Sequence, residues 1–269
     1  MKKLIVISLL IFFFISSYSQ EIKVRRTKKL PVKEEAWFPD FGRNRNEILL
    51  SGKNYDGLVL YHRICRKTRT ISTAPGAGRD FRIDERGNII FSETNIQNGR
   101  KTENHKIYKT DSKAVESLDD YKPGQTVKTN GKSITLQVNN ITEKISPVGD
   151  RYYIWASLSP DKEKLLFTAA GDGSYVSDLE GNIIARLGYI NAPEWINNDW
   201  VVGMEDKDDG EKILSSDIIA IHIHSGKREN LTKRADYIAQ YPKVSPEGQQ
   251  IVFHSLEGDI YFMKIRIKD

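Results

Sequence analysis

Short apolar runs alternate with turn residues along this chain, and one such arrangement occurs twice. Between Trp155 and Leu179, the apolar run Leu165–Thr168 lies between a Ser-Pro-Asp turn and a Gly-Asp-Gly turn. The same order returns between Tyr241 and Ile265, where Ser245-Pro246 takes the place of Ser159-Pro160. Apolar runs of this length, bounded by such turn residues, are typical of β-strands. The recurrence of a strand–turn–strand unit predicts a repeat protein.

Less regular copies of the unit bring the number of repeats to six. The repeats begin near Ala36, Arg79, Tyr121, Trp155, Ala192 and Tyr241. The third, residues 121–148, matches least well, although Asn130-Gly131 is a strong hairpin signal before the alternating run Lys132–Val138. We interpret it as a degenerate blade. Units of roughly 40 residues with several short strands are typical of propeller blades. The sequence therefore predicts an all-β, six-bladed β-propeller.

The last repeat has room for only three strands before the chain ends at Asp269. At the other end, Glu21–Leu30 has the pattern of an isolated strand. We expect this N-terminal strand to complete the last blade, which closes the ring and covers two strand edges. Residues 21–269 are then a single propeller domain. Two polar connections, Asn95–Asn104 and residues 205–211, are predicted to be loops.

The first twenty residues have the pattern of a signal peptide. Lys2-Lys3 precede the apolar run Leu4–Ile15, which is too short for a comfortable membrane span, and small residues precede Gln20. We expect cleavage near Gln20 and export to the periplasm; the alternative is an anchor that is not cleaved. Cys65 is the only cysteine, so it cannot form a disulfide within the chain, and we interpret it as a small buried side chain.

Three phrases carry a resemblance to a known family. SLSPDKEKLLFTA, KVSPEGQQIVFHS and FRIDERGNIIFSE resemble the WD40-like PD40 repeats of periplasmic propellers such as the TolB-like proteins. The similarity covers about Trp37 to Ile265. The chain departs from the full TolB pattern because no α/β domain precedes the first repeat. The resemblance implies a six-bladed periplasmic propeller that binds a protein or a peptidoglycan-associated partner, and it says little about the ligand.

Charge adds little to this picture. The formal net charge is +5, and loss of Lys2 and Lys3 with the leader leaves 5 − 2 = +3. So mild a balance argues against nucleic acid as a partner. The basic segment Glu21–Lys33 has two interpretations: an arm for nucleic acid or lipid head groups, or an outer strand whose lysines and arginines face water. We favour the outer strand.

Several residues invite a chemical interpretation. The Pro-Asp pairs at Pro39-Asp40 and Pro160-Asp161 are interpreted as turn scaffold rather than as catalytic carboxylates. His222 and His224 alternate on a predicted strand, but two ligands do not complete a zinc site. The densest acidic cluster offers Ca²⁺ ligands without EF-hand spacing, so we interpret it as a solvated acidic loop or a patch for a basic partner. Its candidate residues are Glu205, Asp206, Asp208 and Asp209.

Aromatic residues near the starts of the predicted innermost strands are the best candidates for ligand contact. They are Trp37, Trp155, Trp195 and Tyr241. Inner strands of propellers surround the central channel, where such side chains can anchor a peptide or a protein. The alternative is core packing between blades.

We therefore expect a non-enzymatic, monomeric binding module of the cell envelope without cofactor or metal. Two other functions stay open. One is a sensor for a small ligand or a glycan. The other is a propeller hydrolase or lyase, which would need a pair of carboxylates or a metal cluster facing the channel.

Overall fold

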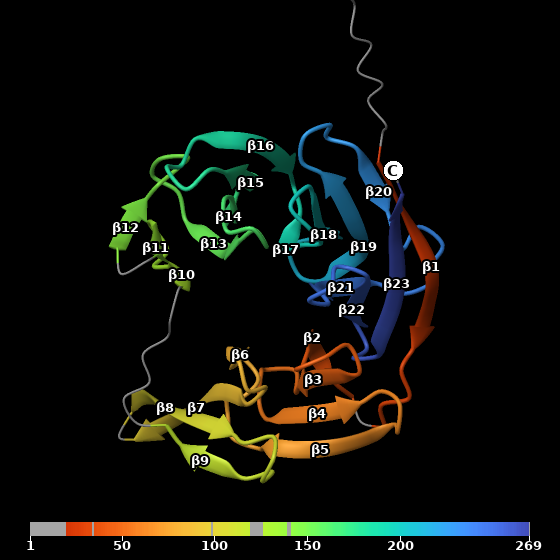
Figure 1. Ribbon diagram of the computed structural model, residues 1–269. Helices are drawn as coiled ribbons and strands as arrows, with labels where there is room; N and C mark the ends of the chain where they lie inside the picture. Colours follow the sequence, from red (N-terminus) through yellow and green to blue (C-terminus); the bar gives the residue numbers. More distant parts are fainter. Residues whose placement is uncertain (1–19, 34, 98, 119–125, 139–140, 269) are drawn as a thin grey trace, which may run out of the picture.

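The structure is a computed structural model that describes residues 20–33, 35–97, 99–118, 126–138 and 141–268. Its strands form six small antiparallel sheets arranged around a central axis, which confirms the all-β, six-bladed propeller (Figure 1). Most of the predicted leader and the start of the third repeat, at residue 121, lie outside the described residues. Within those residues, we find no helix of the length and hydropathy that a membrane crossing requires.

The strands follow one another blade by blade. The first blade holds β2 (Trp37–Phe41), β3 (Glu47–Ser51), β4 (Leu58–His62) and β5 (Lys67–Ser72), and the second holds β6 (Phe81–Ile83), β7 (Ile89–Gln97), β8 (Arg100–Tyr108) and β9 (Val115–Ser117). The third holds β10 (Thr126–Thr129), β11 (Ile134–Val138) and β12 (Ile141–Ile145), and the fourth holds β13 (Tyr153–Leu158), β14 (Leu165–Ala169), β15 (Gly173–Ser177) and β16 (Ile183–Gly188). The fifth holds β17 (Asn191–Trp195), β18 (Trp200–Asp208), β19 (Ile213–His222) and β20 (Arg228–Asn230). The sixth holds β21 (Ala239–Val244), β22 (Gln250–Ser255), β23 (Ile260–Lys268) and, outermost, β1 (Glu21–Lys29).

The second strand of most blades is buried on both faces because a neighbouring blade packs on each side. Strands β3, β14 and β22 are buried at every position. This explains why the repeats show continuous apolar runs instead of a strict alternation of apolar and polar residues. The third sheet has three strands and packs Ile134 and Leu136 against Phe167 of the fourth blade. Residues 126–145 are therefore a blade, as the hairpin signal at Asn130-Gly131 predicted.

Strand β1 lies antiparallel to β23 along the outer edge of the last sheet, with Glu21 opposite Lys268 and Lys29 opposite Tyr261. Its Ile22 is buried between the fifth and sixth blades, in a cluster that includes Trp200 and Met263. The Trp200 indole N–H also donates to Oε1 of Gln20, at 3.2 Å. The first and the last strand of the described residues thus lie in the same sheet.

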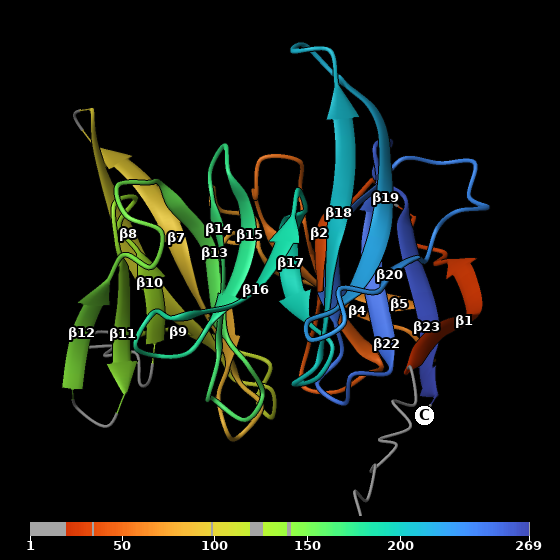
Figure 2. The same ribbon diagram turned by 90° about the horizontal axis from the view of Figure 1, so that it is seen from above.

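Both segments predicted to be polar loops are largely strand. The stretch 95–104 belongs to the β7–β8 hairpin, in which Asn95 lies opposite Thr102. In the acidic stretch, β18 runs on to Asp208 and pairs with β19. Both hairpins extend past the buried part of their blade, and Figure 2 shows β18 and β19 standing above the neighbouring blades. Because few positions of these extensions are buried, they lack the apolar pattern of a strand.

The interpretation of Cys65 was also wrong. It lies in the turn between β4 and β5, which the amide of Arg66 closes by donating to the carbonyl of His62, and its side chain is exposed. The strand-like run that contains it ends three residues earlier, at His62.

Candidate functional site

Four innermost strands share one irregularity. The register of β2, β13, β17 and β21 against the next strand is interrupted at the same place in each blade. One residue at each interruption has a left-handed backbone; these are Phe38, Trp155, Ala192 and Tyr241, with φ between 46° and 50°. Residues other than glycine seldom adopt this conformation, and recurrent backbone strain of this kind points to a functional region.

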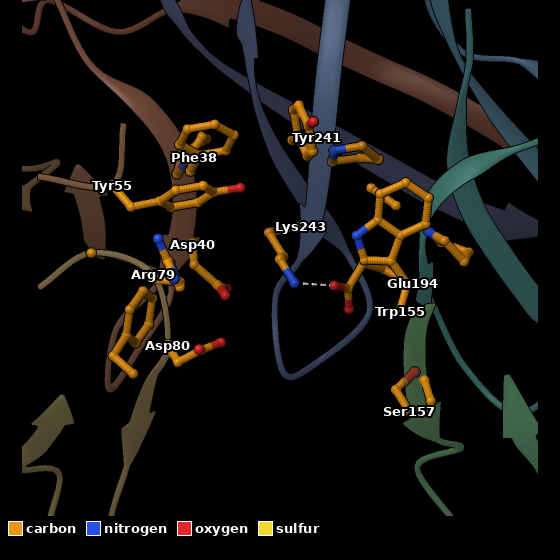
Figure 3. A pocket seen from close by; sticks show the side chains of 17 residues that line it. Phe38, Asp40, Tyr55, Arg79, Asp80, Trp155, Ser157, Glu194, Tyr241 and Lys243 are labelled. Carbon is orange, nitrogen blue, oxygen red and sulfur yellow. Dashed lines mark hydrogen bonds and ion pairs between the residues drawn. The ribbon is translucent and has the colours of Figure 1, made fainter. Parts of the chain in front are cut away.

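The irregular strands turn polar side chains toward the channel. Two residues after each left-handed position stand Asp40, Ser157, Glu194 and Lys243. All four line a cavity of about 630 Å³ in the centre of the ring, together with Arg79 and Asp80 from the second blade. Figure 3 shows Lys243 reaching between Asp40 on one side of the cavity and Glu194 on the other.

Lys243 is the centre of a small ionic network. Its ammonium donates to Oε1 of Glu194 in an ion pair. Burial alone would lower the pKa of Lys243, but the charges of Glu194 and Asp40 outweigh burial and raise it. Protein surrounds the group, yet 40% of the side chain is still reached by water in the channel. The pair is therefore hydrated rather than sealed, and its contribution to stability is reduced by that screening.

Asp40 has an unusual acidity for a carboxyl group. Its burial, reinforced by the nearby charge of Glu194, raises the pKa to about 6, although Lys243 and the Phe41 amide favour the charged form. The Phe41 amide donates to Oδ1 of Asp40 at 2.7 Å. The interpretation of Pro39-Asp40 as a turn was wrong, because Asp40 lies in β2 and the turn of that blade runs from Gly42 to Glu47.

Stacked rings form one wall of the cavity. Phe38 stacks on Tyr55 with ring centroids 3.9 Å apart and meets the edge of Tyr241 at 4.9 Å. Behind them lies His254, stacked with Tyr241 at 5.5 Å, and burial lowers its pKa to about 4. Trp155 lines the opposite side and keeps 38% of its surface exposed. Aromatic faces on two sides of a cavity with charged groups between them suit a ligand that combines apolar and charged parts.

Of the four aromatic residues expected at the channel, the structure brings Trp155 and Tyr241 to this cavity. Trp195 is 8% exposed and packs in the core between the fourth and fifth blades. Trp37 precedes the left-handed residue Phe38 and lies against Gly258. Gly258 has a φ of +81°, and a Cβ added there would come within 2.8 Å of the Trp37 indole. In the first blade, the position equivalent to Trp155 belongs to Phe38.

The four acidic residues of the predicted patch are engaged separately rather than gathered into one cluster. Glu205 pairs with Arg228 at 2.9 Å, and Asp206 accepts from Nδ2 of Asn191 at 2.8 Å. Asp208 and Asp209 accept from backbone amides of their own turn. Only Asp206 is linked to the channel, since its charge adds to burial in raising the pKa of Tyr241.

Metal-ligand chemistry has little support in the described residues, where no group of three or more His, Cys, Asp or Glu side chains could hold an ion. His222 ends β19, and its ring centroid is 5.8 Å from that of His224. Nε2 of His224 is 3.3 Å from a carboxylate oxygen of Asp199.

Sequence reasoning interpreted Asp40 as turn scaffold and missed the other charged residues of the cavity. The signal that could have found them is a tripeptide that recurs on inner strands. It reads Phe38-Pro39-Asp40, Ala192-Pro193-Glu194 and Tyr241-Pro242-Lys243, with Trp155-Ala156-Ser157 as a variant. A proline at the same position in three inner strands, followed by a variable polar residue, marks a shared backbone with a side chain that differs from blade to blade.

Comparison with known proteins supports the fold. A solved structure described as the crystal structure of the tricorn protease matches with a TM-score of 0.54 and 11% identity. The match covers 87% of this chain and 26% of that one, so the chain spans about a quarter of its length. At this identity, the likeness shows the propeller fold alone. No protein-family model and no curated protein matches the sequence, so the resemblance to TolB-like PD40 repeats stays a prediction.

The strain at the channel can be tested where the side chain is smallest. We expect Ala192→Gly to raise the free energy of unfolding by about 1 kcal/mol, because glycine adopts a φ of 46° without the penalty that a Cβ brings. Ala185→Gly, at a position of β16 that has no positive φ, should lower it by about 0.5–1 kcal/mol. Urea denaturation of both variants checks this, and a destabilised Ala192→Gly variant would contradict the strain argument.

Proposed function

We propose that this protein is an exported, non-enzymatic binding module of the cell envelope. In this proposal it recognises a segment of another envelope protein at its central channel, in the manner of TolB-like propellers. The segment combines an aromatic or aliphatic side chain with a charged or hydrogen-bonding group. The propeller fold suits such a role because it commonly mediates protein interactions.

The observation that carries the proposal is the composition of the cavity. Rings of Phe38, Tyr55 and Tyr241 form one wall, and Trp155 forms another. Between them, Lys243 and Glu194 are held in a hydrated ion pair that a bound ligand can exchange for its own charge. Exposed aromatic side chains beside charged groups are typical of the residues that dominate binding energies at protein interfaces.

The test is capture of binding partners from crosslinked envelopes of the source cell, followed by titration of the purified partner. We expect Trp155→Ala combined with Tyr241→Ala to weaken its affinity at least about 30-fold, since each removes an anchor at the cavity. The matched control is Tyr152→Ala combined with Tyr189→Ala, two exposed tyrosines that do not line the cavity. Equal losses in both double variants would contradict the proposed site.

One observation favours a second candidate function, a propeller hydrolase or lyase. Asp40 and Glu194 are two carboxyl groups facing one cavity, and the pKa of Asp40 is raised to about 6. A carboxylic acid whose pKa lies near neutrality, with a second carboxylate in the same cavity, is the arrangement of general acid–base catalysis. In that case, turnover of a panel of aryl glycosides and uronides should be measurable and should fall more than about 100-fold in Asp40→Asn. The binding function predicts no turnover by either protein.

A further inference from the structure

A strongly basic surface lies at the junction of the sixth and first blades, away from the channel. Eight cationic side chains from separate segments meet there; they are Arg25, Arg26, Lys28, Arg45, Arg63, Arg66, Lys264 and Arg266. Five belong to β1 and β23, which pair in the last sheet. The other three lie in the first blade, two of them at the turn after β4 and Arg45 in the turn between β2 and β3. We call this set the basic junction. The N-terminal segment supplies only part of it, so the sequence alone gave no sign of its extent.

The basic junction concentrates the positive charge of the protein. The whole chain has a formal net charge of +5, so the residues outside the junction sum to 5 − 8 = −3. Among the described residues, none of the eight has a carboxylate within ion-pair distance. Cations gathered in this way repel one another, and Lys28 shows the effect. Its pKa is lowered mainly by burial and then by the positive charges of Arg63 and Arg26. An uncompensated cationic surface attracts anionic partners.

The centre of the junction is preformed. Arg26, Lys28, Arg63 and Lys264 line a hollow of about 110 Å³ with Phe262 at its base. The Arg63 guanidinium lies 4.1 Å above the centre of the Phe262 ring. Its Nε is buried and has no partner in the described structure, while one terminal nitrogen donates to Asn46. A guanidinium whose plane is fixed by stacking on a ring is suited to binding a phosphate group.

An apolar side chain stands at the edge of this surface. Ile64 follows Arg63 in the turn between β4 and β5, and it is 71% exposed, the highest value among the exposed large hydrophobic residues of the described chain. The turn presents it beside the exposed Cys65 and between Arg63 and Arg66. An apolar tip between cations is the arrangement that places side chains in the acyl boundary of a bilayer while the charges contact its head groups.

We propose that the basic junction docks the propeller on an anionic membrane surface, with phosphate head groups bound by Arg26, Lys28 and Arg63 and with Ile64 inserted at the acyl boundary. The channel then lies apart from the bilayer and stays free for another ligand. The proposal does not depend on what the channel binds. Nucleic acid fits the junction less well, because its exposed tip is aliphatic, and the one aromatic ring at its centre is covered by Arg63 rather than available for stacking on a base.

The test is co-sedimentation with vesicles of phosphatidylcholine alone and with vesicles that contain phosphatidylglycerol. All variants are prepared without the predicted leader, so differences in vesicle binding come from the substitutions alone. We expect binding only to the anionic vesicles. Arg26→Ala combined with Lys28→Ala should weaken it roughly 30-fold, about 5-fold for each cation removed. Lys128→Ala combined with Lys144→Ala is the matched control, because it makes the same charge change on exposed residues of the third blade.

Ile64→Ser separates a membrane from other polyanions. It should weaken vesicle binding about 5-fold by removing the inserted side chain, and it should leave any binding of a DNA oligonucleotide unchanged. The proposal is overturned if the junction variant binds anionic vesicles as the unchanged protein does, or if the control variant loses as much. It is also overturned if the oligonucleotide binds at the junction while the vesicles do not.

Discussion

Asn in place of Asp40 should turn a nearly level pH profile of stability into one that rises steeply between pH 4 and 6.5. Two groups titrate in this range with opposite effects: Asp40, which lines the channel, and His254, which lies behind its aromatic wall. The pKa of Asp40 is raised from 3.8 to about 6, so the folded state binds the extra proton and the free energy of unfolding falls as pH rises from 4 to 6. The pKa of His254 is lowered from 6.5 to about 4, so here the unfolded state binds the extra proton and stability rises over the same range.

Each group alone is worth up to about 3 kcal/mol, at about 1.4 kcal/mol for each pH unit of displacement. The channel water that reaches Asp40 reduces its share to about 2 kcal/mol. In Asp40→Asn only His254 remains, and we expect the free energy of unfolding to rise by about 3 kcal/mol between pH 4 and 6.5. His254→Asn should show the reverse, a fall of about 2 kcal/mol in the free energy of unfolding, because only Asp40 then titrates in this range. Asn is chosen because it can keep the hydrogen bond to the Ser255 carbonyl.

Urea denaturation at pH intervals from 4 to 7 measures these slopes. Asp111→Asn, at an exposed position between β8 and β9, is the control and should follow the unchanged protein. Parallel profiles for Asp40→Asn and the unchanged protein would mean that Asp40 ionises as freely in the folded channel as in the unfolded chain. The role of Asp40 as an acid of unusual pKa would then have to be given up.

Ile22→Asp should destabilise the protein by about 4 kcal/mol, and Val24→Asp on the same strand by less than about 1 kcal/mol. Ile22 is 3% exposed and packs among residues of the fifth and sixth blades, whereas Val24 is 37% exposed. An aspartate at position 22 is buried in an apolar cluster. An aspartate at position 24 is exposed to water. Thermal and urea denaturation of the pair compare them directly.

The comparison tests whether β1 is an integral strand of the last blade. If Ile22→Asp cost no more than Val24→Asp, β1 would have detached without unfolding the ring, and the sheet would be complete with three strands. A large difference would mean that the N-terminal strand unfolds together with the rest of the propeller.

The fold was predictable because its signal repeats. Apolar runs such as Leu165–Thr168, each following a turn, identified blades, and a strong turn dipeptide identified even the irregular third blade. The polar ends of β7 and β18 were not predictable, since strand pairing beyond the core is held by backbone hydrogen bonds and leaves no apolar pattern.

The candidate site was predictable only in part. Trp155 and Tyr241 were found because they occupy the same place in two closely similar repeats. Asp40, Glu194 and Lys243 are separated by up to about 200 residues, and only the proline that precedes each of them links their repeats. Their meeting depends on how many blades lie between them and on which way an irregular strand turns each side chain. No local window of sequence contains that information.

The pairing of Glu21 with Lys268 has a consequence for how the protein is made. Strand β1 leaves the ribosome about 230 residues before its partner β23, so it waits for that partner on the order of 10–50 s at usual elongation rates. Throughout that interval β1 is an unpaired edge, the kind of segment that aggregates. Its five lysines and arginines repel a second copy of itself, and so the same charges that face water in the finished propeller protect the chain while it waits.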